Sequence, residues 1–102
     1  MKADKVLSLA GLAARAGKVD SGEFSVEKAI KTGKTFLVIA AEDASFNTEK
    51  KFRNSCAYYQ VEFRTYSDKD TLGHAIGKQE RAVIAVNDEG LSKAILAAID
   101  HA

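Results

Sequence analysis

The stretch that decides the fold runs from Ser21 to Asp43 and is SGEFSVEKAIKTGKTFLVIAAED. Its first part predicts a helix from Gly22 to Gly33, because a glycine just past the last helical residue is the usual left-handed stop. The apolar run from Phe36 to Ala41 is short and has no polar break, which indicates a central strand covered on both faces. We therefore expect a helix followed directly by a buried strand.

The start of this helix is a candidate site for an anion or for the edge of a nucleic acid. The first N–H groups of a helix have no partner within it, and the helix dipole places partial positive charge there. Lys28 follows about one turn inside and adds a full positive charge. Ser21 is expected to cap the helix.

The other segments predict further helices and strands in alternation. Ser67, with Asp70 three residues later, resembles a capping box for a short helix that ends at Gly77. Residues 61–66 alternate between apolar and polar, as an edge strand does. The remaining predicted helices cover about residues 4–16, 48–58 and 91–99, and a second apolar strand covers residues 82–86. This order predicts an α/β domain with helices on both faces of a largely parallel or mixed sheet.

Composition limits the class of protein. A chain of 102 residues, 46% of them hydrophobic, is expected to form a single domain over residues 1–102. The one cysteine excludes an intrachain disulfide and suits a reducing compartment. We expect no membrane partner and a cytoplasmic location, because no apolar run approaches the roughly 20 residues of a membrane span and the N-terminus does not resemble a signal peptide. The net charge of +1 differs from that of a strongly basic nucleic-acid binder.

The residue inventory does not favour an enzyme. His74 is expected to be exposed, His101 lies at the C-terminus, and Cys56 falls on an apolar helix face, where it is expected to be a core residue. No Cys/His cluster has the spacing of metal ligands, and no glycine-rich loop fits a nucleotide. We expect no catalytic residues, cofactor, metal or small-molecule substrate. A hydrolase acting through Glu42 and Asp43 is the enzymatic alternative.

A second candidate segment is the fully polar loop Lys78-Gln79-Glu80-Arg81. No residue in it is needed for the core, and polar loops at one end of the sheet are where α/β domains bind ligands. The loop and the helix start at Gly22–Lys28 together form the candidate binding surface.

The order of these segments resembles a known protein family. LAGLAARAGKVDSGEFSVEKAIKTGK (residues 9–34) is similar to the first two helices of the L-seven-Ae ribosomal protein family, whose members bind kink-turn RNA. LVIAAEDAS (37–45) is similar to the central strand and its acidic exit, LGHAIGK (72–78) to a Leu-Gly-x-Ala-x-Gly element, and AVIAVNDEG (82–90) to the last strand and turn. The resemblance covers nearly the whole chain, most closely that of the small bacterial members.

This resemblance implies a three-layer α/β/α sandwich with a four-stranded mixed sheet. It also implies binding to a bent RNA internal loop with tandem sheared G·A pairs, read by the start of the second helix. In the family, the loop before the last strand holds an extruded nucleotide. Carried over to this chain, the RNA-binding residues are Lys18, Gly22, Glu23, Phe24, Ser25, Lys28, Lys78, Gln79, Glu80 and Arg81.

The chain departs from the strongest binders of the family at two places. They carry Asn-Glu where this chain has Phe24-Ser25, and lysines where it has Asp20-Ser21. Asn both donates to and accepts from a base edge, and Phe does neither, so we expect weaker or more context-dependent kink-turn binding. The expected partner is RNA, either ribosomal RNA or an mRNA leader, with the ribosome as a candidate assembly. The alternative function is a protein–protein interaction module on the same fold.

Overall fold

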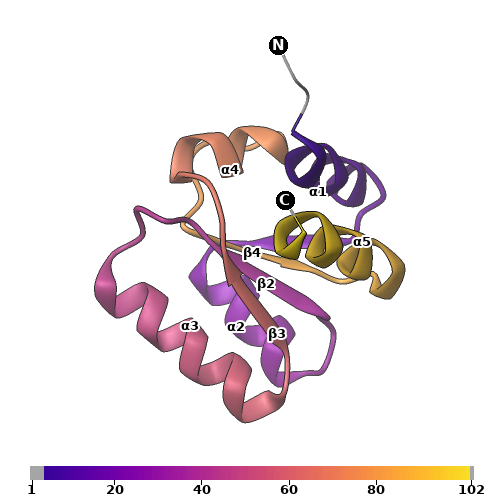
Figure 1. The fold of residues 1–102 in the computed structure, drawn as a ribbon. Coiled ribbons are helices and arrows are strands. Elements are labelled where there is room, and N and C mark those ends of the chain that lie inside the picture. The colour runs from indigo at the N-terminus through magenta and orange to yellow at the C-terminus, as the bar shows by residue number, and fades with distance from the viewer. Residues whose placement is uncertain (1–3, 102) are drawn as a thin grey trace.

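The computed structural model describes residues 4–101, which form α-helices packed on both faces of one sheet (Figure 1). In chain order the elements are α1 (Lys5–Arg15), β1 (Val19–Ser21), α2 (Glu23–Lys31), β2 (Leu37–Ala40), α3 (Phe46–Tyr59), β3 (Glu62–Thr65), α4 (Lys69–Ala75), β4 (Val83–Val86) and α5 (Glu89–Asp100). Helices α3 and α5 begin about two residues earlier than predicted. Ser45 Oγ caps α3 by accepting from the Thr48 N–H at 3.2 Å, and Asp88 Oδ2 caps α5 by accepting from the Leu91 N–H at 2.8 Å.

The sheet has four strands in the order β1-β4-β2-β3. Strands β2 and β3 are parallel, whereas β4 runs antiparallel to both β1 and β2. Every residue of β2 and β4 is buried, and β3 is an exposed edge strand, as their sequence patterns predicted. The four-stranded mixed sheet is therefore confirmed.

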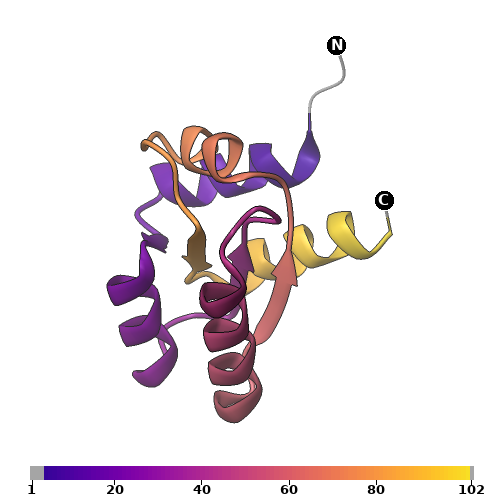
Figure 2. The same cartoon turned by 90° about the vertical axis from the view of Figure 1, so that its left-hand side faces the viewer.

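Three layers result from the alternation of side chains along the central strands. Leu37 and Ile39 of β2 face a core formed with α1, α4 and α5, and Val38 faces a second core formed with α2 and α3. Figures 1 and 2 show the two helical layers on opposite faces of the sheet, with α2 and α3 side by side. The predicted α/β/α sandwich is confirmed. Within residues 4–101, no helix combines the length and apolarity that crossing a membrane requires.

Cys56 is a core residue, as predicted. It lies on α3 beside Phe52 in the core under α2 and is 1% exposed. Burial raises the pKa of the Cys56 thiol to about 11, because the thiolate would lose its hydration. The thiol is therefore neutral and shielded from reagents in the folded protein.

Two predicted helix caps were wrong. Ser21 does not cap α2, because it is the last residue of β1 and pairs with Ile84 across the sheet. Gly22 occupies the cap position with φ of 88°, a conformation that glycine adopts without strain. Ser67 does not cap α4; Asp68 does, accepting from the Thr71 N–H at 2.7 Å. In both cases the cap is the residue after the predicted serine.

Candidate nucleic-acid interface

The N-terminus of α2 is open to a ligand. Gly22 provides no side-chain cap, although its own N–H donates to the Val83 carbonyl of β4 at 3.1 Å and so ties the turn to the sheet. The first hydrogen bond of the helix is donated by the Val26 N–H to the Gly22 carbonyl. The N–H groups of residues 23–25 precede that bond, and among residues 4–101 no acceptor binds them. They are therefore available to an acceptor outside the protein.

Phe24 and Lys28 form the outer face of this helix start. They lie four residues apart and are therefore neighbours on the helix surface. Phe24 is 84% exposed, and Lys28 is exposed, with no carboxylate within 4.0 Å among residues 4–101. They line two shallow pockets of about 220 and 330 Å³, the first also bordered by Ser25. A flat aromatic ring, a cation and free N–H groups thus share one surface.

The polar loop at residues 78–81 is fixed against this region by Arg81. Its Nε donates to Ser21 Oγ at 3.1 Å, next to the turn that starts α2, and its Nη1 donates to the Glu80 carbonyl at 2.9 Å. The Arg81 N–H donates to the Lys69 carbonyl at 3.1 Å. Arg81 is half-buried, so the prediction that no loop residue has a structural role was wrong for this residue. Lys78, Gln79 and Glu80 are exposed.

Close packing against α4 also determines where the loop runs. The loop passes directly over Gly73, where a Cβ atom would lie 1.9 Å from the Gln79 carbonyl oxygen. Only glycine fits this position without moving the loop. This contact gives a physical reason for the first glycine of the LGHAIGK element.

The structure does not bring all the predicted residues together. Lys18 lies at the opposite end of β1 from Gly22, about 13 Å away at the rise of a strand. The Glu23 carboxylate is directed to α3, where it accepts from Thr48 Oγ1 at 3.1 Å. The compact part of the predicted surface is therefore Gly22, Phe24, Ser25 and Lys28, with the loop that Arg81 attaches beside them.

Sequence reasoning missed the start of α3, which is joined to the start of α2 by the Glu23–Thr48 hydrogen bond. Phe46 is 75% exposed there, and Lys50 Nζ lies 5.9 Å from the centre of its ring. The available signal was a large aromatic residue immediately after the capping Ser45, a position that the core does not require. This surface adds a second exposed ring and a second cation near the first pair.

The enzymatic alternative has no support at the strand end that suggested it. Asp43 Oδ1 accepts from the Lys69 N–H at 2.9 Å, so this carboxylate holds the start of α4. Within residues 4–101, no group of three His, Cys, Asp or Glu side chains is placed to hold a metal ion.

Unpaired positive charge gathers around the candidate surface. Across residues 4–101, the basic side chains with no carboxylate within 4.0 Å are Lys5, Arg15, Lys18, Lys28, Lys50, Lys69, Lys78 and Arg81. Of these, Lys28 belongs to the start of α2, and Lys69, Lys78 and Arg81 belong to the loop and its support. The near-neutral net charge therefore conceals a local surplus, which is what attracts a polyanion.

Comparison with known proteins places this surface in a family context. The model of the ribosomal protein L7Ae/L30e/S12e/Gadd45 family matches residues 4–96. The RNA-binding protein YlxQ of Bacillus subtilis (strain 168) is 44% identical over 92 residues, which is 90% of this chain and 92% of the relative. RNA-binding protein YlxQ of Enterococcus faecium is 39% identical over 90 residues, covering 87% and 85% of the two chains. The resemblance to small bacterial members, of the YlxQ type, is thereby confirmed.

Solved structures agree with this assignment of the fold. A protein of unknown function from Bacillus halodurans superposes with a TM-score of 0.93 at 45% identity, covering 96% of this chain and 99% of that one. The Giardia lamblia 15.5kD RNA binding protein superposes with a TM-score of 0.82 at 21% identity, covering 95% and 83%. The second similarity shows that the fold is shared at low sequence identity.

Proposed function

Because the chain belongs to the ribosomal protein L7Ae/L30e/S12e/Gadd45 family, we propose that it is a non-enzymatic, cytoplasmic RNA-binding protein that recognises kink-turn RNA. The two relatives most similar in sequence among those compared are named as RNA-binding proteins. The proposed ligand is a sharply bent internal loop with tandem sheared G·A pairs, in ribosomal RNA or an mRNA leader. Association with the ribosome is part of this proposal.

The observation that carries the proposal is the open start of α2 beside the loop attached by Arg81. Two segments about sixty residues apart in the chain meet there through the hydrogen bond between Arg81 and Ser21. The free N–H groups of residues 23–25 and the Lys28 ammonium are donors only, which suits the acceptor atoms of guanine edges and of phosphates. The loop contributes Lys78 to the adjoining backbone phosphates.

Each part of the surface has a distinct task in this proposal. The N-terminal turn of α2 and Lys28 select G·A pairs, because they reach base edges in the widened groove. Lys78 and Arg81 position the protein on the phosphate backbone without reading sequence. Phe24 stacks on an exposed base or sugar, as aromatic residues do in RNA sites.

The mechanism is selection of shape. A kink-turn exchanges between an extended and a bent form, and a protein that binds the bent form better shifts the equilibrium by its difference in affinity. The surface supports such a preference because its donors lie on two separate segments held at fixed positions. A regular duplex would meet one segment at a time.

A binding titration at one defined salt concentration tests the proposal. One RNA is a standard kink-turn, and the matched control is the same RNA with Watson–Crick pairs in place of the G·A pairs. We expect clearly tighter binding to the kink-turn. Equal binding to both RNAs, or binding to neither, would favour the protein–protein interaction module instead.

A further inference from the structure

A groove between α1 and α4 lies outside the surface proposed above. It consists of two adjoining cavities of about 510 and 390 Å³, which share the walls formed by Gly11, Arg15, His74 and Ala75. The larger cavity lies within the range of 300–1,000 Å³ typical of small-ligand sites. We call these two cavities the α1–α4 groove.

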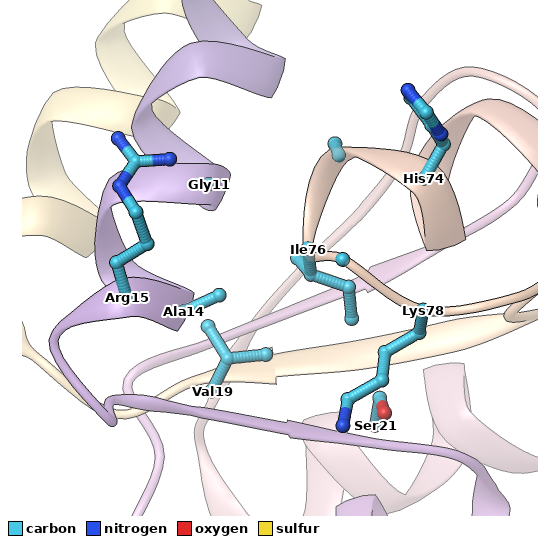
Figure 3. A pocket seen from close by; sticks show the side chains of 10 residues that line it. Gly11, Ala14, Arg15, Val19, Ser21, His74, Ile76 and Lys78 are labelled. Atoms are coloured by element: carbon cyan, nitrogen blue, oxygen red, sulfur yellow. The ribbon is translucent and has the colours of Figure 1, made fainter.

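Close approach of the two helices forms one wall of the groove. A Cβ atom on Gly11 would lie 2.9 Å from the Ala75 carbonyl oxygen and 3.4 Å from Arg15 Nη1. The Arg15 guanidinium therefore lies back over Gly11, along the length of the groove. Figure 3 shows Arg15 and His74 on opposite sides of the open space.

The floor of the larger cavity is apolar. Ala14, Val19 and Ile76 line it between the two helices (Figure 3), and all three pack against the core on the α1 side of the sheet. A floor of aliphatic side chains suits a flat, weakly polar group such as a nucleobase. It offers no polar partner that would have to be replaced on binding.

The rim of the groove is cationic. Arg15 and Lys78 have no carboxylate within 4.0 Å among residues 4–101, and the larger cavity is lined by no acidic residue. The carboxylate of the groove is Asp4 at its far end, which already accepts from the Tyr66 hydroxyl at 2.6 Å and from the Leu7 N–H at 3.0 Å. An anionic group is therefore favoured in the half of the groove nearest Lys78.

The groove is continuous with the candidate interface. Ser21 lines the larger cavity and also accepts the hydrogen bond from Arg81. Lys78 extends along the cavity wall toward Ser21 (Figure 3). An RNA strand that passes the loop at residues 78–81 therefore enters the groove without crossing a negatively charged surface.

We propose that the α1–α4 groove binds one or two unpaired nucleotides of single-stranded RNA, with bases against Val19 and Ile76 and phosphates against Arg15 and Lys78. The His74 imidazole, which borders both cavities, stacks or donates at their junction. This inference rests on RNA being the ligand of the protein. It adds a contact for unpaired RNA to the proposed recognition of a kink-turn.

The test uses the intact protein and two probes: hexauridylate, which is single-stranded, and a kink-turn RNA whose stems are closed and carry no overhang. In the wild type, hexauridylate is expected to shift the amide resonances of Gly11, Val19, Ile76 and Gly77. The double variant Arg15→Ala/His74→Ala should bind hexauridylate about tenfold more weakly and with a salt slope lower by about 0.7 per lost phosphate contact. Its affinity for the closed kink-turn should be unchanged.

Two further variants keep the test decisive. Lys28→Ala should lose kink-turn affinity and keep hexauridylate binding, the reverse of the double variant. Lys93→Ala, in an exposed pair with Glu89, removes a distant positive charge and should affect neither probe. Both Arg15 and His74 lie in last helical turns, where basic groups also stabilise helices, so unfolding is measured alongside. Resonance shifts confined to α2 and the loop, or equal hexauridylate binding by wild type and double variant, would overturn the inference; loss of kink-turn binding in the wild type would instead overturn the proposed function.

Discussion

Arg81 Nε donates a hydrogen bond to Ser21 Oγ at 3.1 Å, joining two segments that are sixty residues apart in the chain. The same guanidinium holds the Glu80 carbonyl, so one side chain fixes both the turn before α2 and the path of the loop. Because Arg81 is also a candidate phosphate contact, its structural and binding roles have to be separated by experiment.

Replacing Arg81 should therefore affect both folding and binding, whereas replacing Lys78 should affect binding alone. Arg81→Ala is expected to lower the free energy of unfolding by about 1 kcal/mol, the usual net worth of a hydrogen bond. Lys78→Ala is exposed and should change it by less than about 0.5 kcal/mol. The combined variant should weaken binding to all RNAs and reduce the salt slope by about one unit per lost phosphate contact. An unchanged slope, measured by titration at several salt concentrations, would remove this loop from the interface.

Lys28→Ala should reduce kink-turn affinity by about 1–3 kcal/mol, because the lysine is proposed to donate to a guanine edge. Unfolding should change by no more than about 0.5 kcal/mol, since the side chain is exposed and makes no ion pair within residues 4–101. Lys31→Ala is the matched control on the same helix, because Lys31 pairs with Glu27 at 3.3 Å. A kink-turn affinity equal to that of the wild type would contradict the proposed recognition.

Phe24→Asn should raise kink-turn affinity. An Asn amide both donates to and accepts from a base edge, and stronger binders of the family carry Asn at this position. The gain is expected to be about 1–3 kcal/mol for the kink-turn and absent for the Watson–Crick control RNA. Phe24 is 84% exposed, so folding should not suffer. A lower affinity for both RNAs would show instead that stacking by Phe24 dominates at this position.

Gly73→Ala should displace the loop at residues 78–81, because its Cβ would lie 1.9 Å from the Gln79 carbonyl oxygen. We expect the free energy of unfolding to fall by about 1–3 kcal/mol, as in other overpacked sites, together with RNA affinity. Gly90→Ala is the matched control in helix α5, where the new methyl group would be 3.5 Å from Asp88 Oδ2, an ordinary contact. Denaturant unfolding of both variants measures the difference, and equal stability would refute the close approach.

The buried thiol predicts a pH dependence of stability. The pKa of Cys56 is raised from 9.0 to about 11, so stability from this group is complete below pH 9 and declines between pH 9 and 11 as the unfolded chain loses its proton first. By pH 10 the loss should be about 1 kcal/mol relative to pH 8. Comparison with Cys56→Ala isolates this contribution, because the variant lacks the titrating group. Under native conditions at pH 7.5, a thiol reagent should label Cys56 only as fast as the protein opens; rapid labelling would contradict its burial.

Local sequence determined much of the fold. Apolar periodicity identified the helices, the two fully buried strands and the exposed edge strand, because these patterns reflect the period of each element and the faces that it buries. The position of Cys56 on an apolar face placed it in the core for the same reason. The two caps were missed by one residue each, since strand pairing of Ser21 and the left-handed φ of Ser67 moved the helix starts to Gly22 and Asp68.

Tertiary structure alone decided the composition of the candidate surface. Periodicity says nothing about strand order, and it is the antiparallel pairing of β1 with β4 that brings Ser21 to Arg81 and leaves Lys18 at the far end of its strand. The start of α3, with exposed Phe46, joined the surface through packing of α2 against α3. The α1–α4 groove likewise depends on the distance between two helices, which Gly11 allows to be short and which no pattern within either helix specifies. Contacts between distant segments require the global arrangement of the chain, whereas the elements require only their own residues.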